Sequence, residues 1–145
     1  MTKTNELHIN FPALSENEAL ARMCASAFAA QFNPTIEELS DIRTAVSEAV
    51  TNAIIHGYNS RPLPVYMDIY RQDERLKIVI RDTGRGIENV AEAMQPFYTT
   101  IPGEERSGMG FSVMQAFMDE LTVSSEPGIG TTVTMTKTIG QDILE

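Results

Sequence analysis

The sequence predicts an α+β sandwich of two layers, in which helices pack on one face of a mostly antiparallel sheet. Segments that alternate polar and apolar residues occur in pairs joined by short turns, which is the pattern of β-hairpins. Longer segments repeat apolar residues with the helical period and begin with capping patterns. Hairpins together with grouped helices indicate this class.

The first part of the chain predicts one strand and two helices. Residues 7–11 alternate apolar and polar side chains, as a half-buried strand does. Residues 15–32 and 35–57 have helical periodicity, and Asn33-Pro34 separates them. Each helix opens with a capping-box pattern, in which a Ser or Thr is followed three residues later by Glu. The two pairs are Ser15 with Glu18 and Thr35 with Glu38.

The rest of the chain predicts two hairpins and two short helices around an irregular segment. That segment, 95–106, contains two prolines and a glycine with little periodicity, and we expect it to be a mobile flap beside the glycine-rich turn that follows. The predicted elements are strands at 65–71 and 76–82, a helix at 89–94, a helix at 110–119 and strands at 121–125 and 131–138.

Length and composition indicate a single domain, 1–145. At 145 residues and 42% apolar content the chain can bury one core but not two. Its net charge of −9, without a cluster of Lys or Arg, argues against nucleic-acid binding and either serves solubility or suits a basic protein partner. No apolar run approaches the roughly 20 residues that span a bilayer, and the N-terminus has no hydrophobic signal core. The single Cys24 permits no internal disulfide, which fits a reducing compartment. Taken together, these observations lead us to expect a cytoplasmic protein without membrane or direct nucleic-acid contacts.

The second predicted helix carries a polar stripe. Glu48, Asn52 and His56 are spaced four residues apart and therefore share one face beside the apolar one. Asn disfavours helix interiors, so its presence here needs a reason. Its amide oxygen could bind Mg²⁺, and a carboxylate one turn earlier could accept a proton from an attacking hydroxyl. The alternative is a solvated helix face with chance spacing.

A carboxylate and two glycines end the strand at 76–82. Asp82 could accept a hydrogen bond from an exocyclic amine such as adenine N6, while Gly84 and Gly86 would let the chain approach the base closely. The alternative is an ordinary Asp-x-Gly turn.

Two further glycine-rich turns follow. Ser107-Gly-Met-Gly-Phe111 leads into a helix, a geometry that holds phosphate on backbone N–H groups. The alternative is a flexible hinge with a helix cap, which would have the same sequence pattern. Arg106, just before it, could pair with a terminal phosphate or be an ordinary surface arginine. Gly128-Ile-Gly-Thr131 is a weaker signal, because a hairpin turn explains it equally well.

In this fixed order the motifs resemble those of the GHKL ATPase superfamily, which includes gyrase, MutL and the histidine kinases. Glu48-x-x-x-Asn52 is similar to its N box, Asp82-x-Gly-x-Gly86 to its first glycine box, and the flap to its ATP lid, here about 95–107. Gly108-x-Gly110 and Gly128-x-Gly130-Thr131 are similar to its later glycine motifs. The fold implied is the two-layer Bergerat-type sandwich with a mixed, mostly antiparallel sheet. The chain is most similar to the sporulation anti-sigma F family of serine kinases, from about Leu7 to Lys137, notably over 46–58 and 105–111.

This resemblance implies an enzyme that binds ATP or ADP with Mg²⁺ and phosphorylates a serine of an anti-anti-sigma protein. It also implies a homodimer that binds and inhibits a sporulation sigma factor. By the resemblance Glu48 is the catalytic base, Asn52 the Mg²⁺ ligand and Asp82 the adenine acceptor. Arg22 falls where the family contacts its protein partners. The remaining nucleotide contacts implied are Gly84, Gly86, Thr99, Thr100, Arg106, Ser107, Gly108, Met109, Gly110, Phe111 and Thr131.

The chain departs from the family at Ile101, where relatives commonly have a lysine in the lid, which leaves Arg106 as the expected phosphate partner. Two close alternatives are a stress-response anti-sigma kinase and a nucleotide-gated sigma-binding module without significant kinase activity. A histidine kinase would need a dimerisation helix with an acceptor histidine, whereas the only histidines are His8 and His56. A gyrase- or MutL-type ATPase would need a second domain that contributes a catalytic lysine.

Overall fold

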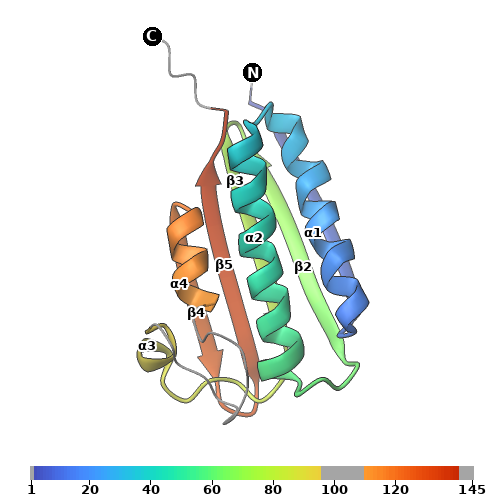
Figure 1. Ribbon diagram of the computed structural model, residues 1–145, viewed down its shortest axis with the longest axis vertical. Helices are drawn as coiled ribbons and strands as arrows, with labels where there is room; N and C mark the ends of the chain where they lie inside the picture. Colours follow the sequence, from blue (N-terminus) through green and yellow to red (C-terminus); the bar gives the residue numbers. More distant parts are fainter. Residues whose placement is uncertain (1, 96–109, 141–145) are drawn as a thin grey trace.

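The computed structural model describes residues 2–95 and 110–140. Its elements follow the predicted order, with strands first and last and two long helices between the first two strands (Figure 1). They are β1 (Thr4–Pro12), α1 (Ser15–Ala29), the 3-10 turn η1 (Ala30–Phe32), α2 (Ile36–Asn52), the π-helical turn η2 (Ala53–Gly57), β2 (Pro64–Gln72), β3 (Arg75–Asp82), α3 (Val90–Ala93), α4 (Gly110–Phe117), β4 (Glu120–Glu126) and β5 (Gly130–Thr138).

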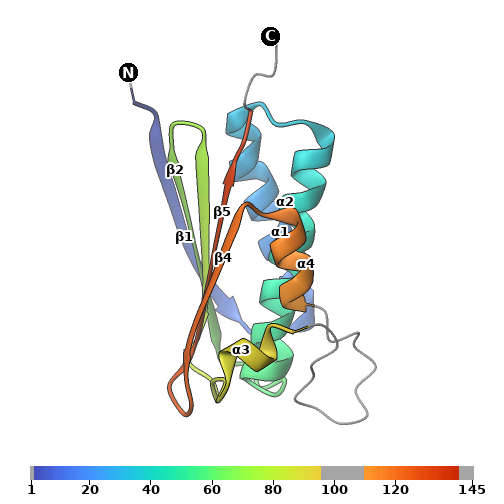
Figure 2. The same ribbon diagram turned by 90° about the vertical axis from the view of Figure 1, so that its left-hand side faces the viewer.

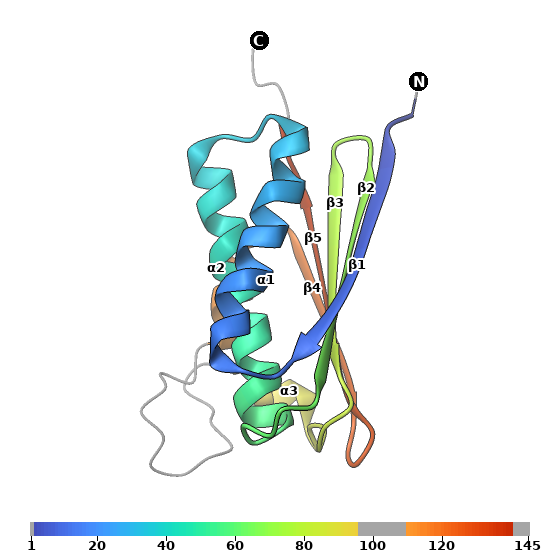
Figure 3. The same cartoon turned by 90° about the vertical axis from the view of Figure 1, so that its right-hand side faces the viewer.

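The five strands form one sheet in the order β1-β2-β3-β5-β4. Helices α1, α2 and α4 all lie on the same side of this sheet (Figures 2 and 3). The predicted α+β sandwich with helices on one face is therefore confirmed. All four pairings between the described strands are antiparallel, so the parallel component of the expected mixed sheet is not found among them. The reason is that β5 follows β4 through a tight turn and then lies between β4 and β3, antiparallel to both.

The core lies between the sheet and the three helices. Strand alternation sends Leu76, Ile78 and Ile80 of β3 to the helix-covered face, where each is at most 2% exposed. Fully burying such a side chain contributes roughly 1.5–3 kcal/mol. The same alternation places Asp82 at the end of this apolar column, so that a carboxylate is buried with it. The chain's periodicity thus positions a polar group at the edge of the core.

The two predicted capping boxes have different outcomes. At α2 the box is confirmed, because Glu38 N–H donates to Thr35 Oγ1 at 3.0 Å and Thr35 N–H donates to Glu38 Oε1 at 2.9 Å. At α1 the prediction is wrong: Leu14 is the N-cap and makes no side-chain cap bond. The chain leaves β1 so directly that Leu14 N–H bonds the Pro12 carbonyl at 2.7 Å, which puts Ser15 inside the helix.

These outcomes predict unequal effects of removing the two hydroxyls. Thr35→Ala is expected to lower the free energy of unfolding by about 1 kcal/mol, because the Glu38 N–H loses its acceptor. Ser15→Ala, the matched control, is expected to change it by less than about 0.5 kcal/mol. Urea unfolding of the two variants beside the wild type measures both values. Equal losses would contradict the different roles assigned here.

The second predicted helix does run to Gly57, but its last turn widens. The Tyr58 N–H bonds the Ala53 carbonyl at 3.0 Å, a π-helical spacing that often occurs at functional sites. The helix therefore ends with Gly57 against the loop that follows β3. Among the residues that the structure describes, no helix is both long and apolar enough to span a membrane.

Candidate nucleotide site

The expected N-box residues lie where α2 meets the start of α4. Glu48 and Asn52 are half-buried and one turn apart on α2. Gly110, the first residue of α4, packs directly on both of them. A Cβ atom added to Gly110 would lie 3.0 Å from Asn52 Nδ2 and 3.2 Å from Glu48 Oε1. The structure thus brings together two motifs that are far apart in the sequence, and it places the N-terminal end of a helix beside Asn52.

Asp82 is a buried acceptor at the end of β3. Its residue is 6% exposed, and its Oδ1 accepts the Gly84 N–H at 2.8 Å. Burial raises the pKa of this carboxyl, while N–H groups of Gly84 and Thr131 and the charge of Arg81 partly oppose the rise. A carboxylate destabilised by desolvation gains most from an additional hydrogen-bond donor. A ligand amine reaching this position would be such a donor.

Glycines allow the end of the long helix to pack on the loop after Asp82. A Cβ on Gly57 would lie 2.8 Å from the Asp82 carboxylate atoms, and a Cβ on Gly84 would lie 2.0 Å from the Gly57 carbonyl oxygen. Gly86 has a φ of +76°, and a Cβ there would lie 2.1 Å from the Glu126 carbonyl oxygen. The sequence predicts that Gly84 and Gly86 let the backbone approach a nucleotide base closely. The structure adds a second reason, which is packing of the protein on itself.

Residues 83–87, which we name the strap, are tied to both neighbouring segments. The Arg85 N–H donates to the Gly57 carbonyl at 3.0 Å, and Arg85 Nε donates to the His56 carbonyl at 2.9 Å. These bonds satisfy carbonyls that the helix end leaves open, with a cation at the favourable end of its dipole. The Arg85 carbonyl accepts the Gly128 N–H at 2.8 Å from the β4–β5 turn. The strap therefore links the helix that carries Glu48 and Asn52 to the last glycine motif.

Thr131 lies directly opposite Asp82 across the β3–β5 ladder and is 9% exposed. Its hydroxyl is 2.8 Å from Ser125 Oγ. Ser125 Oγ donates to the Gly130 carbonyl at 2.9 Å and accepts the Ile87 N–H at 2.8 Å, so Thr131 must be the donor in the contact between the two hydroxyls. The structure thus joins Thr131 to Asp82 through its backbone and to the end of the strap through Ser125.

Tyr58 holds the other end of the strap. Its ring is fully buried, and its hydroxyl donates to the Pro64 carbonyl at 2.6 Å and accepts the Thr83 N–H at 2.7 Å. No sequence motif points to a role for the side chain of Tyr58 or of Ser125. A tyrosine directly after a helix end is a weak signal, because its hydroxyl matters only once the ring is known to be buried. Ser125 gave no signal, since polar residues are ordinary at the end of a strand.

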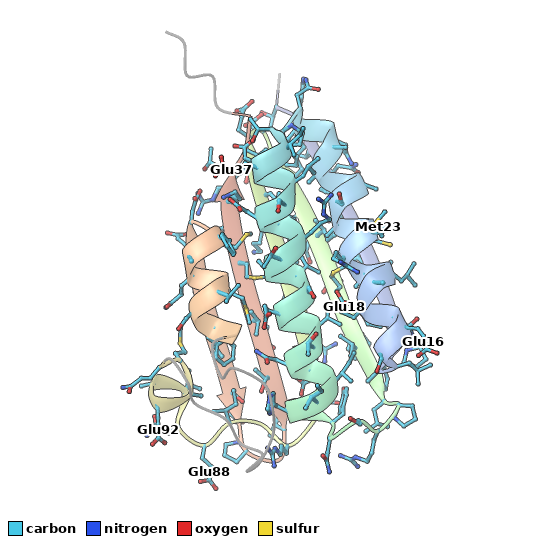
Figure 4. All side chains as sticks on the ribbon, in the orientation of Figure 1. Glu16, Glu18, Met23, Glu37, Glu88 and Glu92 are labelled. Carbon is cyan, nitrogen blue, oxygen red and sulfur yellow. The ribbon has the colours of Figure 1, made fainter. Side chains whose placement is uncertain are left out.

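Of two further predicted residues, Phe111 adjoins Gly110 at the start of α4, whereas Arg22 lies away from the site. Phe111 is partly buried and packs against the core. Arg22 is on α1, which lies on the opposite side of α2 from α4, so it is not part of the cluster around Gly110 (Figure 1). Its Nε is 3.2 Å from Glu18 Oε2 without hydrogen-bond geometry, which makes the pair electrostatic. Met23, 61% exposed, and Glu16 are on the outer side of the same helix (Figure 4).

The other expected contacts fall outside the described residues. They are the lid at about 95–107 beyond Gln95, with Thr99, Thr100, Ile101 and Arg106, and then Ser107, Gly108 and Met109.

A magnesium ion would fit the residues at Asn52. Within 2–95 and 110–140, no three His, Cys, Asp or Glu side chains form a group that could hold a metal. Mg²⁺ bound with a nucleotide needs few protein ligands, because phosphates and waters fill most of its octahedral positions. One amide oxygen beside a helix start, as at Asn52 and Gly110, suits that mode of binding.

Comparison with known proteins places this geometry in a family. Residues 11–137 match the model of the histidine kinase-like ATPase domain. An anti-sigma F factor of Thermoanaerobacter sp. (strain X514) is 54% identical over 142 residues, which cover 98% of this chain and 99% of that protein. An anti-sigma F factor of Bacillus licheniformis is 53% identical over 134 residues, 92% of each chain. Both relatives are thus similar over nearly their whole length.

Solved structures with the same fold are more distant in sequence. The RsbU and RsbW domains of a Mycobacterium tuberculosis protein give a TM-score of 0.65 at 22% identity, over 93% of this chain and 32% of that one. The histidine kinase domain of a blue-light activated kinase from Erythrobacter litoralis gives 0.51 at 26% identity, over 72% of this chain and 46% of that one. The first likeness bears on the fold alone. Because the family model and the relatives cover most of the sequence, the chain belongs to the histidine kinase-like ATPase family and, within it, to the anti-sigma F factors.

Proposed function

We propose that the chain is an ATP-dependent protein-serine kinase and anti-sigma factor. It binds ATP or ADP with Mg²⁺, phosphorylates a serine of an anti-anti-sigma protein and, as a cytoplasmic homodimer, binds and inhibits a sporulation sigma factor. The observation that carries the proposal is the continuous path from Gly110 through Glu48 and Asn52 to Gly57 and Asp82. This path joins the motifs of an ATP site in a chain that is similar to anti-sigma F factors over nearly its full length.

Each end of the path has a proposed role. At the buried end, Asp82 accepts a hydrogen bond from the N6 amine of adenine. The base lies beside Gly84, Gly86 and Thr131. At the other end, Asn52 would hold Mg²⁺, which when bound would neutralise charge on the phosphates. The start of α4, Gly110 and Phe111, lies beside the phosphates. The remaining proposed contacts lie outside the described part of the chain. They are the lid with Thr99 and Thr100, and then Arg106, Ser107, Gly108 and Met109.

Glu48 is the proposed base for the transfer. The serine oxygen attacks the γ-phosphorus, the bond from that phosphorus to the ADP oxygen breaks, and the serine proton passes to the Glu48 carboxylate. Phosphoryl transfer needs little covalent assistance, so positioning and charge neutralisation supply most of the rate. Arg22, on the far side of α2, is proposed to contact the protein partners rather than the nucleotide.

A phosphotransfer assay tests this function. The purified chain is mixed with ATP labelled at the γ-phosphate and the candidate anti-anti-sigma protein of the same genome, with Mg²⁺ or with EDTA. Label on a serine of the partner, lost in EDTA, is the expected result. ATP binding without any transfer would contradict the kinase and favour a nucleotide-gated sigma-binding module. Binding of a stress-response sigma factor in place of a sporulation one would favour the stress-response alternative.

The raised pKa of Asp82 predicts how base selectivity depends on pH. Only the ionised carboxyl is purely an acceptor, so protonation removes the preference for an amine. Because burial raises this pKa, the preference is expected to fall with decreasing pH at values above the ordinary titration range of Asp. The ratio of ATP to inosine triphosphate affinities measures it, since the titration of the phosphates cancels in the ratio. A ratio that stays constant down to the ordinary Asp range would contradict the role of Asp82.

A further inference from the structure

The hydroxyl of Tyr58 has no hydrogen-bonding capacity left for a ligand. Its single proton is donated to the Pro64 carbonyl at 2.6 Å, and one lone pair accepts the Thr83 N–H at 2.7 Å. The Thr83 hydroxyl is 3.1 Å away, and it must be the donor there because the tyrosine proton is already used. The ring is 0% exposed. Any influence of Tyr58 on a bound nucleotide must therefore act through the residues that it holds.

What it holds is the peptide group directly after Asp82. The Asp82 carboxylate is oriented by two backbone N–H groups, those of Thr131 and Gly84. Thr131 is fixed by the β3–β5 ladder, which runs as far as this pair. Gly84 lies beyond the ladder, in the strap, and the Tyr58 hydroxyl is the anchor nearest to it on the Asp82 side. Without that hydroxyl the Thr83 N–H lacks its acceptor, and the peptide can turn toward water.

We infer that Tyr58 is a positioning residue for base selection: its buried hydroxyl fixes the Thr83 peptide, and this fixes the Gly84 N–H that orients the Asp82 carboxylate toward adenine. The inference rests on the proposed function, because it needs Asp82 to read the base. Ser125 anchors the opposite end of the strap at Ile87 and also holds the Gly130–Thr131 peptide, whose N–H is the other group that bonds the Asp82 carboxylate. The two hydroxyls are thus similar in bonding, but Tyr58 supports the Gly84 N–H and Ser125 supports the Thr131 N–H.

The test compares Tyr58→Phe with Tyr66→Phe. The control removes a hydroxyl of the same kind from β2, where Tyr66 lies under the Arg81 guanidinium, 4.2 Å from its ring centre, on the sheet face away from the helices. Affinities for ATP and for inosine triphosphate, which carries a carbonyl in place of the amine, are measured for each protein. Tyr58→Phe is expected to lower the ratio of ATP affinity to inosine triphosphate affinity about tenfold. Most of this change is a loss of ATP affinity, as expected when an aligned charged hydrogen bond is lost. Tyr66→Phe is expected to keep the wild-type ratio.

The outcomes separate this inference from the proposed function. If Tyr58→Phe lowers the affinities for both nucleotides equally, or leaves the ratio of the two affinities at its wild-type value, the positioning role is overturned. The proposed ATP binding would then still stand. A wild-type protein with no preference for ATP would overturn the proposed reading of adenine by Asp82, before any variant is compared. If Tyr58→Phe does not fold, hydrogen exchange on the wild type decides: the Thr83 amide is expected to exchange slowly, and exchange at the rate of an unbonded loop amide would overturn the inference.

Discussion

Glu48→Gln is expected to keep ATP affinity and to lower the rate of serine phosphorylation by a factor of about 10²–10⁴, the usual contribution of a positioned general base. Glutamine has the size of glutamate and can keep the contact with Gly110, where Glu48 Oε1 would lie 3.2 Å from an added Cβ. It cannot accept the proton of the attacking serine. The substitution therefore removes the proposed chemistry while disturbing the packing of α4 on α2 very little.

The matched control is Glu37→Gln. Glu37 is an exposed residue in the first turn of the same helix, at the end remote from Asn52, and its substitution changes the net charge by the same amount (Figure 4). Single-turnover transfer to the partner serine and equilibrium ATP binding are measured on both variants. Unchanged transfer by Glu48→Gln would contradict its assignment as base. Loss of ATP binding would instead show that Glu48 serves the nucleotide or its metal.

Local spacing predicted the elements well wherever a local interaction decides them. The alternation of β3 predicted its strand, and the same alternation explains why the structure buries Asp82 with Ile80. The Thr35 pattern predicted a capping box because both of its bonds lie within one turn. The same pattern at Ser15 failed, since the path of the chain out of β1 moved the cap to Leu14. Sequence periodicity contains no information on that path.

The site was predictable as a set of motifs but not as a set of contacts. The resemblance named Glu48, Asn52, Asp82 and Gly110, and the structure places each of them on the path described above. It gave no reason for Tyr58, whose role depends on a bond between its hydroxyl and the Thr83 N–H across 25 positions of sequence. Buried hydroxyls of this kind acquire partners only when the tertiary structure forms.

The glycines of the first box illustrate how a correct prediction can have an incomplete reason. Close approach to a nucleotide base requires a glycine at position 84 only in the nucleotide complex. The Gly57 carbonyl explains it in the protein alone, because the two backbones pack directly on each other. This second reason predicts that substitution of Gly84 affects folding as well as binding, which the nucleotide alone does not predict.

Gly84→Ala is accordingly expected to lower the free energy of unfolding by about 3 kcal/mol, the upper part of the usual range for overpacking a well-packed site. The added Cβ would lie 2.0 Å from the Gly57 carbonyl oxygen and 3.0 Å from Asp82 Oδ1, so either the helix end or the strap must move. Moving the strap displaces the N–H that orients Asp82. ATP affinity is therefore expected to fall along with stability, as measured by urea unfolding and by equilibrium binding below the unfolding transition.

Gly128→Ala separates this steric effect from backbone strain. Gly128 has a φ of +78°, but a Cβ there would meet no atom within 4 Å, whereas Gly84 is not among the glycines with positive φ. Alanine at 128 is expected to cost about 1 kcal/mol through its left-handed conformation and to leave ATP affinity close to that of the wild type. If Gly84→Ala were no more destabilising than this control and bound ATP normally, the contact between the strap and Gly57 could not be what requires the glycine. A large loss at Gly84 alone would mean that the end of α2 and the base-reading carboxylate are held as one unit by backbone packing, so that the geometry at Asp82 exists before any nucleotide arrives.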